Sequence, residues 1–262
     1  MILPIYEIAF DCFDPHRVAA FWRAALEYEQ DMPTAKELDA AYAAHPEWRD
    51  IAIVEDKLAR HPRLYLQRVA EPKRDRNRLT FDVVLPQSTI ERLDGLGAMK
   101  LDAEWFGDVE GNEFRVRQGD GPPRFHAVVI DALDPSRMAR FWGQTLGFSV
   151  TSDRCDPPEM HCEAGELIVA GRRLGIRVPG HGTPPDGRVH QFTPGLEFRS
   201  TIEPKVAKNR IHFDLIPTAV EQDRAETFAR GAKPEDIART GHRGMFDPEG
   251  NEFCLHTDEM FA

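Results

Sequence analysis

His212 and Asp214 have the residue types and the spacing of an acid–base pair. They lie two residues apart in the run IHFDL, where apolar and polar residues alternate as in a half-buried strand. Side chains two apart on a strand point to the same face, so His212 could act as a general base that Asp214 orients. The alternative is a structural aspartate, because Asp82 stands at the corresponding place of an earlier run in which Thr80 replaces the histidine.

Cys254 is the third candidate for chemistry. It stands in a second predicted strand, with Glu252 and His256 on the same face. Near His212 its thiol could be a nucleophile or a soft metal ligand, whereas most lone cysteines are inert core residues. The sequence contains no phosphate-binding loop, dinucleotide fingerprint or Gly-x-Ser-x-Gly elbow. Nucleotide and acyl-transfer chemistry therefore have no support in the sequence.

Composition limits the function further. Of the 262 residues, 41% are hydrophobic and 29% are charged, as in a soluble globular protein. No apolar run approaches the roughly 20 residues that span a bilayer, and the first residues lack the basic start of a secretory signal. We therefore expect a cytoplasmic protein. Its formal net charge of −11 makes nucleic acid and anionic membranes poor partners.

The elements that must position these residues occur twice in the chain. The matching blocks are 10–28 with 130–148, 71–83 with 203–215, and 108–114 with 247–253. Three blocks in the same order indicate a duplication. We expect one domain at 1–119 and a second at 124–262, joined by the turn-rich segment QGDGPPR, with extra loop residues between 151 and 199.

Each copy predicts a strand, a helix and further strands. The predicted strands are 5–13, 64–69, 79–85 and 113–116, and then 125–133, 197–201, 211–216 and 252–256. One predicted helix starts at Pro15, after the cap Asp14. Three further predicted helices cover 89–96, 135–146 and 219–229. The Phe-Trp pairs at 21–22 and 141–142 have the helical spacing of core residues, and the Asn-Arg pairs at 77–78 and 209–210 could pin the loops that lead into strands.

The runs DPSRMARFWGQTLGF, KNRIHFDL and FDPEGNEFCL resemble the glyoxalase-like branch of the vicinal oxygen chelate superfamily. This superfamily also contains glyoxalase I, bleomycin-resistance proteins and extradiol dioxygenases. The resemblance covers nearly the whole chain, once per copy. It implies an α+β fold of tandem vicinal-oxygen-chelate domains, in which two βαβββ modules per domain form a cupped mixed sheet. We expect the copies to pack as an internal pseudo-dimer, in a monomer or a homodimer.

The resemblance also implies where a metal would bind, because metal-dependent members use four cup-facing strand positions. In the first copy these positions hold Glu7, Gln67, Thr80 and Arg115. Threonine and arginine do not hold a divalent cation, and Arg115 could instead neutralise Glu7. We therefore expect the first copy to be a metal-free scaffold, with Glu7, Gln67 and Arg115 available to line a second pocket.

In the second copy the first of these positions holds Ala127, with His126 beside it on the opposite face, and the others hold Arg199, His212 and Cys254. His212 fits the family pattern. A soft zinc site of His126, His212 and Cys254 would require that His126 turns inward. We expect no cofactor, with a divalent metal as the alternative.

These residues favour a small-molecule site in the cup of the second copy, with His212 and Asp214 as candidate catalytic residues. The candidate substrate-binding residues are Asp131, Arg199, Glu252 and Cys254, with Glu7, Gln67 and Arg115 in the other cup. Our hypothesis is a metal-independent isomerase, lyase or cyclase in which Arg199 receives an anionic or carbonyl oxygen and His212 transfers a proton. The alternatives are a non-catalytic antibiotic-binding or resistance protein, and a metal-dependent glyoxalase or dioxygenase that uses His212 with Cys254 or His126.

Overall fold

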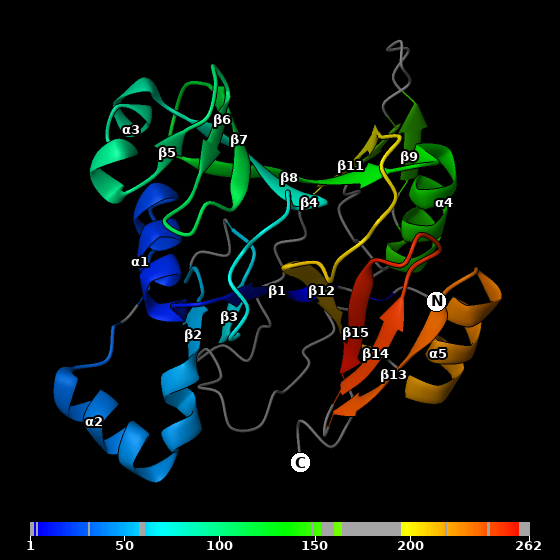
Figure 1. Ribbon diagram of the computed structural model, residues 1–262, viewed down its shortest axis with the longest axis horizontal. Coiled ribbons are helices and arrows are strands. Elements are labelled where there is room, and N and C mark those ends of the chain that lie inside the picture. The colour runs from blue at the N-terminus through cyan, green and yellow to red at the C-terminus, as the bar shows by residue number, and fades with distance from the viewer. Residues whose placement is uncertain are drawn as a thin grey trace, which may run out of the picture.

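The computed structural model describes most of the chain. The described residues are 3, 5–30, 32–57, 61–147, 149–152, 160–163, 195–217, 219–239 and 242–256. The expected loop insertion between 151 and 199 lies largely outside them. The described strands form two mixed sheets with a few helices, which confirms the expected α+β class (Figure 1).

One sheet has seven strands in the order β13-β14-β15-β12-β1-β3-β2. They are β1 (Ile5–Cys12), β2 (Ile51–Val54), β3 (Leu64–Arg68), β12 (Ile211–Leu215), β13 (Lys233–Arg239), β14 (His242–Phe246) and β15 (Glu252–His256). β1 lies between β12, to which it is antiparallel, and β3, to which it is parallel.

The other sheet has eight strands in the order β5-β6-β7-β4-β8-β11-β10-β9. They are β4 (Leu79–Leu85), β5 (Met99–Lys100), β6 (Trp105–Gly107), β7 (Glu113–Gln118), β8 (Arg124–Ala132), β9 (Ser149–Ser152), β10 (Met160–Glu163) and β11 (Gly195–Ser200). The antiparallel pair β4 and β8 lies at its centre.

Each sheet therefore combines one module from each copy. Strands from residues 5–68 pair with strands from 211–256, and strands from 79–118 pair with strands from 124–200. Two sheets of two modules each were expected, but the expectation that each copy forms its own cup is wrong, because the chain enters the other sheet after β3 and again after β11. The boundaries 1–119 and 124–262 stay a prediction about the sequence repeat.

Two helices begin as the sequence predicts. α1 (Pro15–Ala25) and α4 (Pro135–Leu146) are capped by Asp14 and Asp134, whose side chains each accept a backbone N–H three residues on. Proline occupies the first position of both helices, where its missing N–H costs nothing. The two helices are thus started by the same local interactions in both copies.

The EGN turns of the third repeated block hold the entry to these helices. The Glu110 carboxylate accepts hydrogen bonds from the backbone N–H groups of Phe13 and Asp14, at 2.8 and 2.6 Å. Glu249 makes the same two bonds, at 2.8 and 2.7 Å, to the residues before α4. The repeated glutamate is therefore a structural residue.

The core lies between the sheets and is built around two tryptophans. Trp22 of α1 contacts the rings of Phe81 and Phe114 in the 8-stranded sheet, with centroids 5.0 Å apart in both pairs. Trp142 of α4 makes the matching contacts with the phenylalanines of β12 and β15. The Phe-Trp pairs are thus core residues, as predicted, and they join the two sheets.

Two segments, 69–78 and 201–210, lead from one sheet to the other. In each, the asparagine before the next strand, Asn77 or Asn209, donates to the asparagine of an EGN turn, at 3.2 and 2.9 Å. The following arginines donate to backbone carbonyls. This confirms that the Asn-Arg pairs pin the loops that lead into β4 and β12.

Several elements were not predicted. The range 89–96 holds the end of α3 (Gln87–Ile90) and a 3₁₀ turn (Asp94–Leu96) rather than one helix. α5 (Val220–Ala229) agrees with the prediction. α2 (Ala35–Ala44) buries none of its residues and stands off the sheets (Figure 1). Within the described part of the chain, none of the helices has the length and apolarity that crossing a bilayer requires.

Candidate functional site

The face of the 7-stranded sheet that points away from the core carries polar side chains at its centre, and we call this face the 7-stranded cup. In β12 the isoleucine, phenylalanine and leucine belong to the core, so strand alternation turns His212 and Asp214 to the cup. In β15, Phe253 and Leu255 belong to the core, and Cys254 faces the cup. Parallel pairing of these strands places Cys254 beside Asp214.

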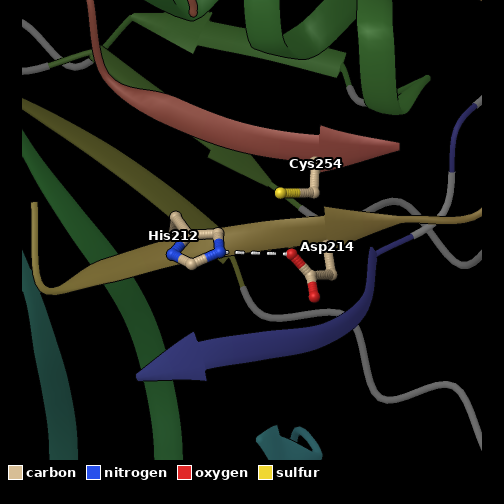
Figure 2. A group of neighbouring side chains, drawn as sticks. All are labelled: His212, Asp214 and Cys254. Atoms are coloured by element: carbon tan, nitrogen blue, oxygen red, sulfur yellow. Dashed lines mark ion pairs between the residues drawn. The ribbon is translucent and has the colours of Figure 1, made fainter. Parts of the chain in front are cut away.

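His212, Asp214 and Cys254 form a compact group (Figure 2). Nε2 of His212 lies 3.4 Å from Oδ1 of Asp214, and both side chains are less than 10% exposed. One donor atom from each of the three residues lies within 4.8 Å of the others. Nδ1 of His212 is buried and has no hydrogen-bond partner among the described residues. The group thus contains a histidine with one nitrogen toward a carboxylate and the other buried without a partner among the described residues.

Charged residues of β1 surround this group, each with its own partner. Glu7 is buried and accepts a hydrogen bond from Nε of Arg63 at 2.8 Å. Asp11 accepts hydrogen bonds from the Gln67 amide and from the Lys208 ammonium. Glu7 on β1 and Gln67 on β3 therefore lie in the same sheet as His212, so the expectation that they belong to a separate cup is wrong, because β1 pairs with β12.

Glu252 has a structural role in addition to its expected place in the cup. Its carboxylate accepts hydrogen bonds from Nζ of Lys205, at 2.7 Å, and from the backbone N–H of Asn209, at 3.2 Å. The first copy repeats both contacts with Glu113 and Lys73. Glu252 therefore anchors the segment 201–210 while it also lines the cup.

Two cavities open at this site. The smaller, of about 80 Å³, lies in the cup against His212, Asp214, Cys254 and Tyr65. The larger, of about 760 Å³, lies between the segments 69–78 and 201–210 and is lined almost wholly by residues of these repeated segments. Lys208 and Glu235 line both cavities. A molecule larger than the cup could thus extend from His212 into the wider space.

The corresponding face of the 8-stranded sheet contains an ion-pair network. Asp82 is fully buried, and Arg117 binds it with Nε at 2.8 Å and Nη2 at 2.7 Å. Arg117 also lies 3.3 Å from Glu197, which is 3.2 Å from Nε2 of His126. Burial raises the pKa of Asp82, although the Arg117 guanidinium opposes this shift. In this sheet the repeated aspartate thus has an arginine partner, where Asp214 has a histidine.

The remaining candidates in the 8-stranded sheet are paired as well. Arg115 lies 2.7 Å from Glu104, and Arg199 lies 2.6 Å from Asp131. The Arg199 guanidinium also stands over the ring of Trp105, 5.1 Å from its centroid. These arginines are held by the protein's own acidic and aromatic groups.

The sequence profile of the family described as Glyoxalase-like domain matches residues 7–117 and again residues 127–256. The protein belongs to this glyoxalase-like family. Among curated proteins, none matches the chain significantly.

Solved structures agree with the glyoxalase-like fold. Glyoxalase I from Zea mays has a TM-score of 0.62 at 11% identity, over 99% of this chain and 94% of the maize chain. The E144Q mutant of the maize enzyme has a TM-score of 0.59 at 12% identity, over 99% and 95% of the two chains. A Bacillus subtilis protein whose assignment as a dioxygenase is provisional has a TM-score of 0.55 at 10% identity, over 98% and 86%. At these identities the likeness shows the fold alone.

The expected glyoxalase-like cup of the second copy is divided in the structure. Asp131 and Arg199 lie on β8 and β11 of the 8-stranded sheet, whereas His212, Asp214 and Cys254 lie on β12 and β15 of the 7-stranded sheet. The prediction that these residues share one cup is wrong, because β11 and β12 enter different sheets. Arg199 therefore does not face the same ligand as His212.

Two further expectations about the glyoxalase-like cups are wrong for the same reason. His126 contacts Glu197 in the 8-stranded sheet, so it does not complete a zinc site with His212 and Cys254. Arg115 lies in that sheet too, and Glu7 is neutralised by Arg63 instead. Loop lengths alone do not show which sheet a strand joins.

The two groups that could hold a metal differ in quality. His212, Asp214 and Cys254 supply nitrogen, oxygen and sulfur, and the unpartnered Nδ1 of His212 agrees with a ligand role. Three such ligands with a fourth position left open are typical of catalytic zinc. The second group is Asp82, His126 and Glu197, but Arg117 already binds both of its carboxylates. The residues of the 7-stranded cup therefore fit a metal, and those of the other sheet do not.

Three polar side chains of the cup were not predicted from the sequence: Tyr65, Lys208 and Glu235. Tyr65 follows the strand alternation of β3 and could have been found by that signal. Lys208 lies in a repeated loop, and Glu235 lies in β13, which carries no alternating pattern in the sequence. The last two positions depend on how distant segments pack.

Proposed function

We propose that the protein acts on a small organic molecule in the 7-stranded cup and that His212 transfers a proton during the reaction. The observation that carries the proposal is the arrangement of His212: it is buried, lines a cavity, has Nε2 3.4 Å from Asp214, and has no described partner at Nδ1. Membership of the protein in the glyoxalase-like family supports the fold of the site. The reaction classes that we propose are metal-independent isomerase, lyase or cyclase chemistry.

The geometry assigns a role to each nitrogen of His212. When Nε2 carries the proton and points it at the Asp214 carboxylate, Nδ1 holds the lone pair and can accept a proton from the substrate. The resulting imidazolium lies next to a negative charge that stabilises it. Asp214 thus favours the tautomer that carries the proton on Nε2. Cys254 lies close enough to contact the same substrate atoms.

The test compares two histidine-to-glutamine variants. Metabolite-like compounds are screened by thermal shift, and each hit is followed for product by NMR. His212→Gln is expected to slow turnover by roughly 10²–10⁴-fold, the usual contribution of a general base or acid. His126→Gln, on the other sheet and 43% exposed, is expected to leave turnover unchanged. A ligand recovered chemically unchanged after long incubation would contradict catalysis and favour a non-catalytic, antibiotic-binding type of protein.

A metal centre at His212, Asp214 and Cys254 is the second candidate function. The donor set favours it, because nitrogen, oxygen and thiolate ligands together suit zinc. A bound metal would polarise a substrate oxygen there, and the three side chains would hold it. Metal analysis of protein purified without chelator tests this: less than about a tenth of an equivalent per chain would contradict it, and His212→Gln should lower the metal content.

A further inference from the structure

A glycine determines where the side chain of Glu235 lies. A Cβ atom on Gly244 would overlap Oε2 of Glu235, so the carboxylate occupies the space that the side chain of any other residue would fill. Gly244 pairs with Cys254, which pairs with Asp214. The Glu235 carboxylate therefore lies over the neighbouring strand β14, next to the row of residues that carries the candidate site.

Glu235 also has a charge that the described residues do not neutralise. No hydrogen bond or ion pair joins its carboxylate to another residue in the described part of the chain. The nearby charges are already in use: Lys208 binds Asp11, and Glu252 binds Lys205. Since Glu235 lines both the cup and the larger cavity, this negative charge stands where the two spaces meet.

The other groups of the lining have chemistry of the same kind. Asp214 adds a second carboxylate, and Tyr65 adds an aromatic ring. Carboxylates and aromatic rings together bind cationic nitrogen, through charge-assisted hydrogen bonds and cation–π contacts. The unpartnered Nδ1 of buried His212 is an independent sign that a ligand completes this lining.

We propose that Glu235 determines the specificity of the 7-stranded cup, by binding a protonated amine or guanidinium on the small molecule. The inference rests on the proposed function of this cup. The cup volume of about 80 Å³ admits only a few atoms, so a larger ligand keeps its reacting end near His212 and its remainder in the cavity of about 760 Å³. Glu235, where the two cavities meet, then binds a cationic group in the part of the ligand that connects its reacting end to its remainder.

Binding of three probes with one shape tests the charge preference. Benzylamine, benzyl alcohol and benzoate share a ring and carry a positive, a zero and a negative charge at pH 7.5. By calorimetry, the wild-type protein is expected to bind benzylamine most tightly, and Glu235→Gln to weaken that binding by about tenfold or more. Glu221→Gln, the same change at a side chain that is 78% exposed, is expected to have no effect. Equal binding of benzylamine to wild-type protein and Glu235→Gln would overturn the assignment.

A second variant keeps the charge and moves it. Gly244→Ala forces the Glu235 side chain out of its place, so benzylamine binding should weaken although the carboxylate remains. Gly95→Ala is the matched control, because a Cβ there meets nothing within 4 Å. Circular dichroism checks that both variants fold. If Gly244→Ala folds and retains full benzylamine affinity, the position of Glu235 is not what selects the ligand.

Protection of Cys254 from iodoacetamide separates this proposal from that of the function itself. Peptide mass spectrometry follows the labelling of Cys254, which lines the cup. Protection by benzylamine and not by benzoate is expected. Protection by benzoate alone or by all three probes equally would overturn the cation preference and leave the cup as the ligand site. Protection by none of them would count against both proposals.

Discussion

The pair Arg78 and Glu249 makes a measurable prediction, because it joins the two copies of the chain. Glu249 accepts two backbone N–H groups before α4 and also lies 3.2 Å from Nη2 of Arg78. The two side chains are 11% and 6% exposed. Glu110, the equivalent residue of the first copy, makes the same backbone bonds. Comparison of the two glutamates therefore separates the backbone bonds from the arginine contact.

The expected size of the effect follows from these contacts. A hydrogen bond to a charged group is worth about 1.5–3 kcal/mol, and the residues before the helices are exposed enough that water replaces part of a lost bond. We take the low end for each of two bonds, so Glu110→Ala should lower the free energy of unfolding by about 3 kcal/mol. Glu249→Ala should cost about 1–2 kcal/mol more, because it also leaves the largely buried Arg78 without its charge partner.

Urea denaturation followed by tryptophan fluorescence measures both costs. Arg78 also donates to two backbone carbonyls, so the stability lost on replacing Arg78 alone is larger than the contribution of the Arg78–Glu249 ion pair. A double-mutant cycle of Arg78→Met with Glu249→Gln removes these other losses and should give a coupling of about 1–2 kcal/mol. The same cycle of Arg78→Met with Glu110→Gln should give a coupling near zero. Equal couplings for the two glutamates, or none for Glu249, would refute the reasoning.

Three further predictions follow from buried groups. Burial raises the pKa of Asp247 to about 6, above the ordinary 3.8. The contribution of the protonated carboxyl to stability is therefore complete below about pH 4 and is lost as the pH rises to about 6, a loss on the order of 3 kcal/mol. In urea titrations at several pH values, Asp247→Asn should flatten this part of the dependence of stability on pH. Nε1 of Trp142 donates to Asp247 at 3.3 Å whereas Nε1 of Trp22 has no partner among the described residues, so Trp142→Phe should lower the unfolding free energy by about 1 kcal/mol more than Trp22→Phe in the same assay. The thiol of Cys12 is fully buried, which raises its pKa, so mass spectrometry after brief iodoacetamide treatment should find Cys254 labelled and Cys12 unlabelled.

Local interactions explain why much of the fold could be predicted. The caps Asp14 and Asp134 and the prolines after them start both helices, and their signal lies within a few residues. The alternation in β12 placed His212 and Asp214 on one face, and the structure brings them to 3.4 Å. The duplication itself predicted two equivalent halves, because the same residues recur in the same order.

The parts that could not be predicted depend on contacts between distant segments. The sequence of β12 does not determine whether it pairs with β8 or with β1, because β8 and β1 have similar strand patterns and either could pair with it in the antiparallel direction. The prediction that β11 and β12 share one sheet placed Arg199 in the cup of His212, whereas Arg199 lies in the 8-stranded sheet. Glu235 was missed because its place depends on the absence of a side chain at Gly244, on another strand.

The crossing of the two copies gives the molecule a nested order of assembly. All strands of the 8-stranded sheet come from residues 79–200, so this sheet can close while later residues are still being synthesised. The 7-stranded sheet must wait, because Ile8 pairs with Phe213, about 200 residues away. Until then β1 has one unpaired edge, which is open to wrong pairing with other chains. Because His212 and Cys254 lie on these late strands, the cup can form only after β12 and β15 have joined β1 in the sheet.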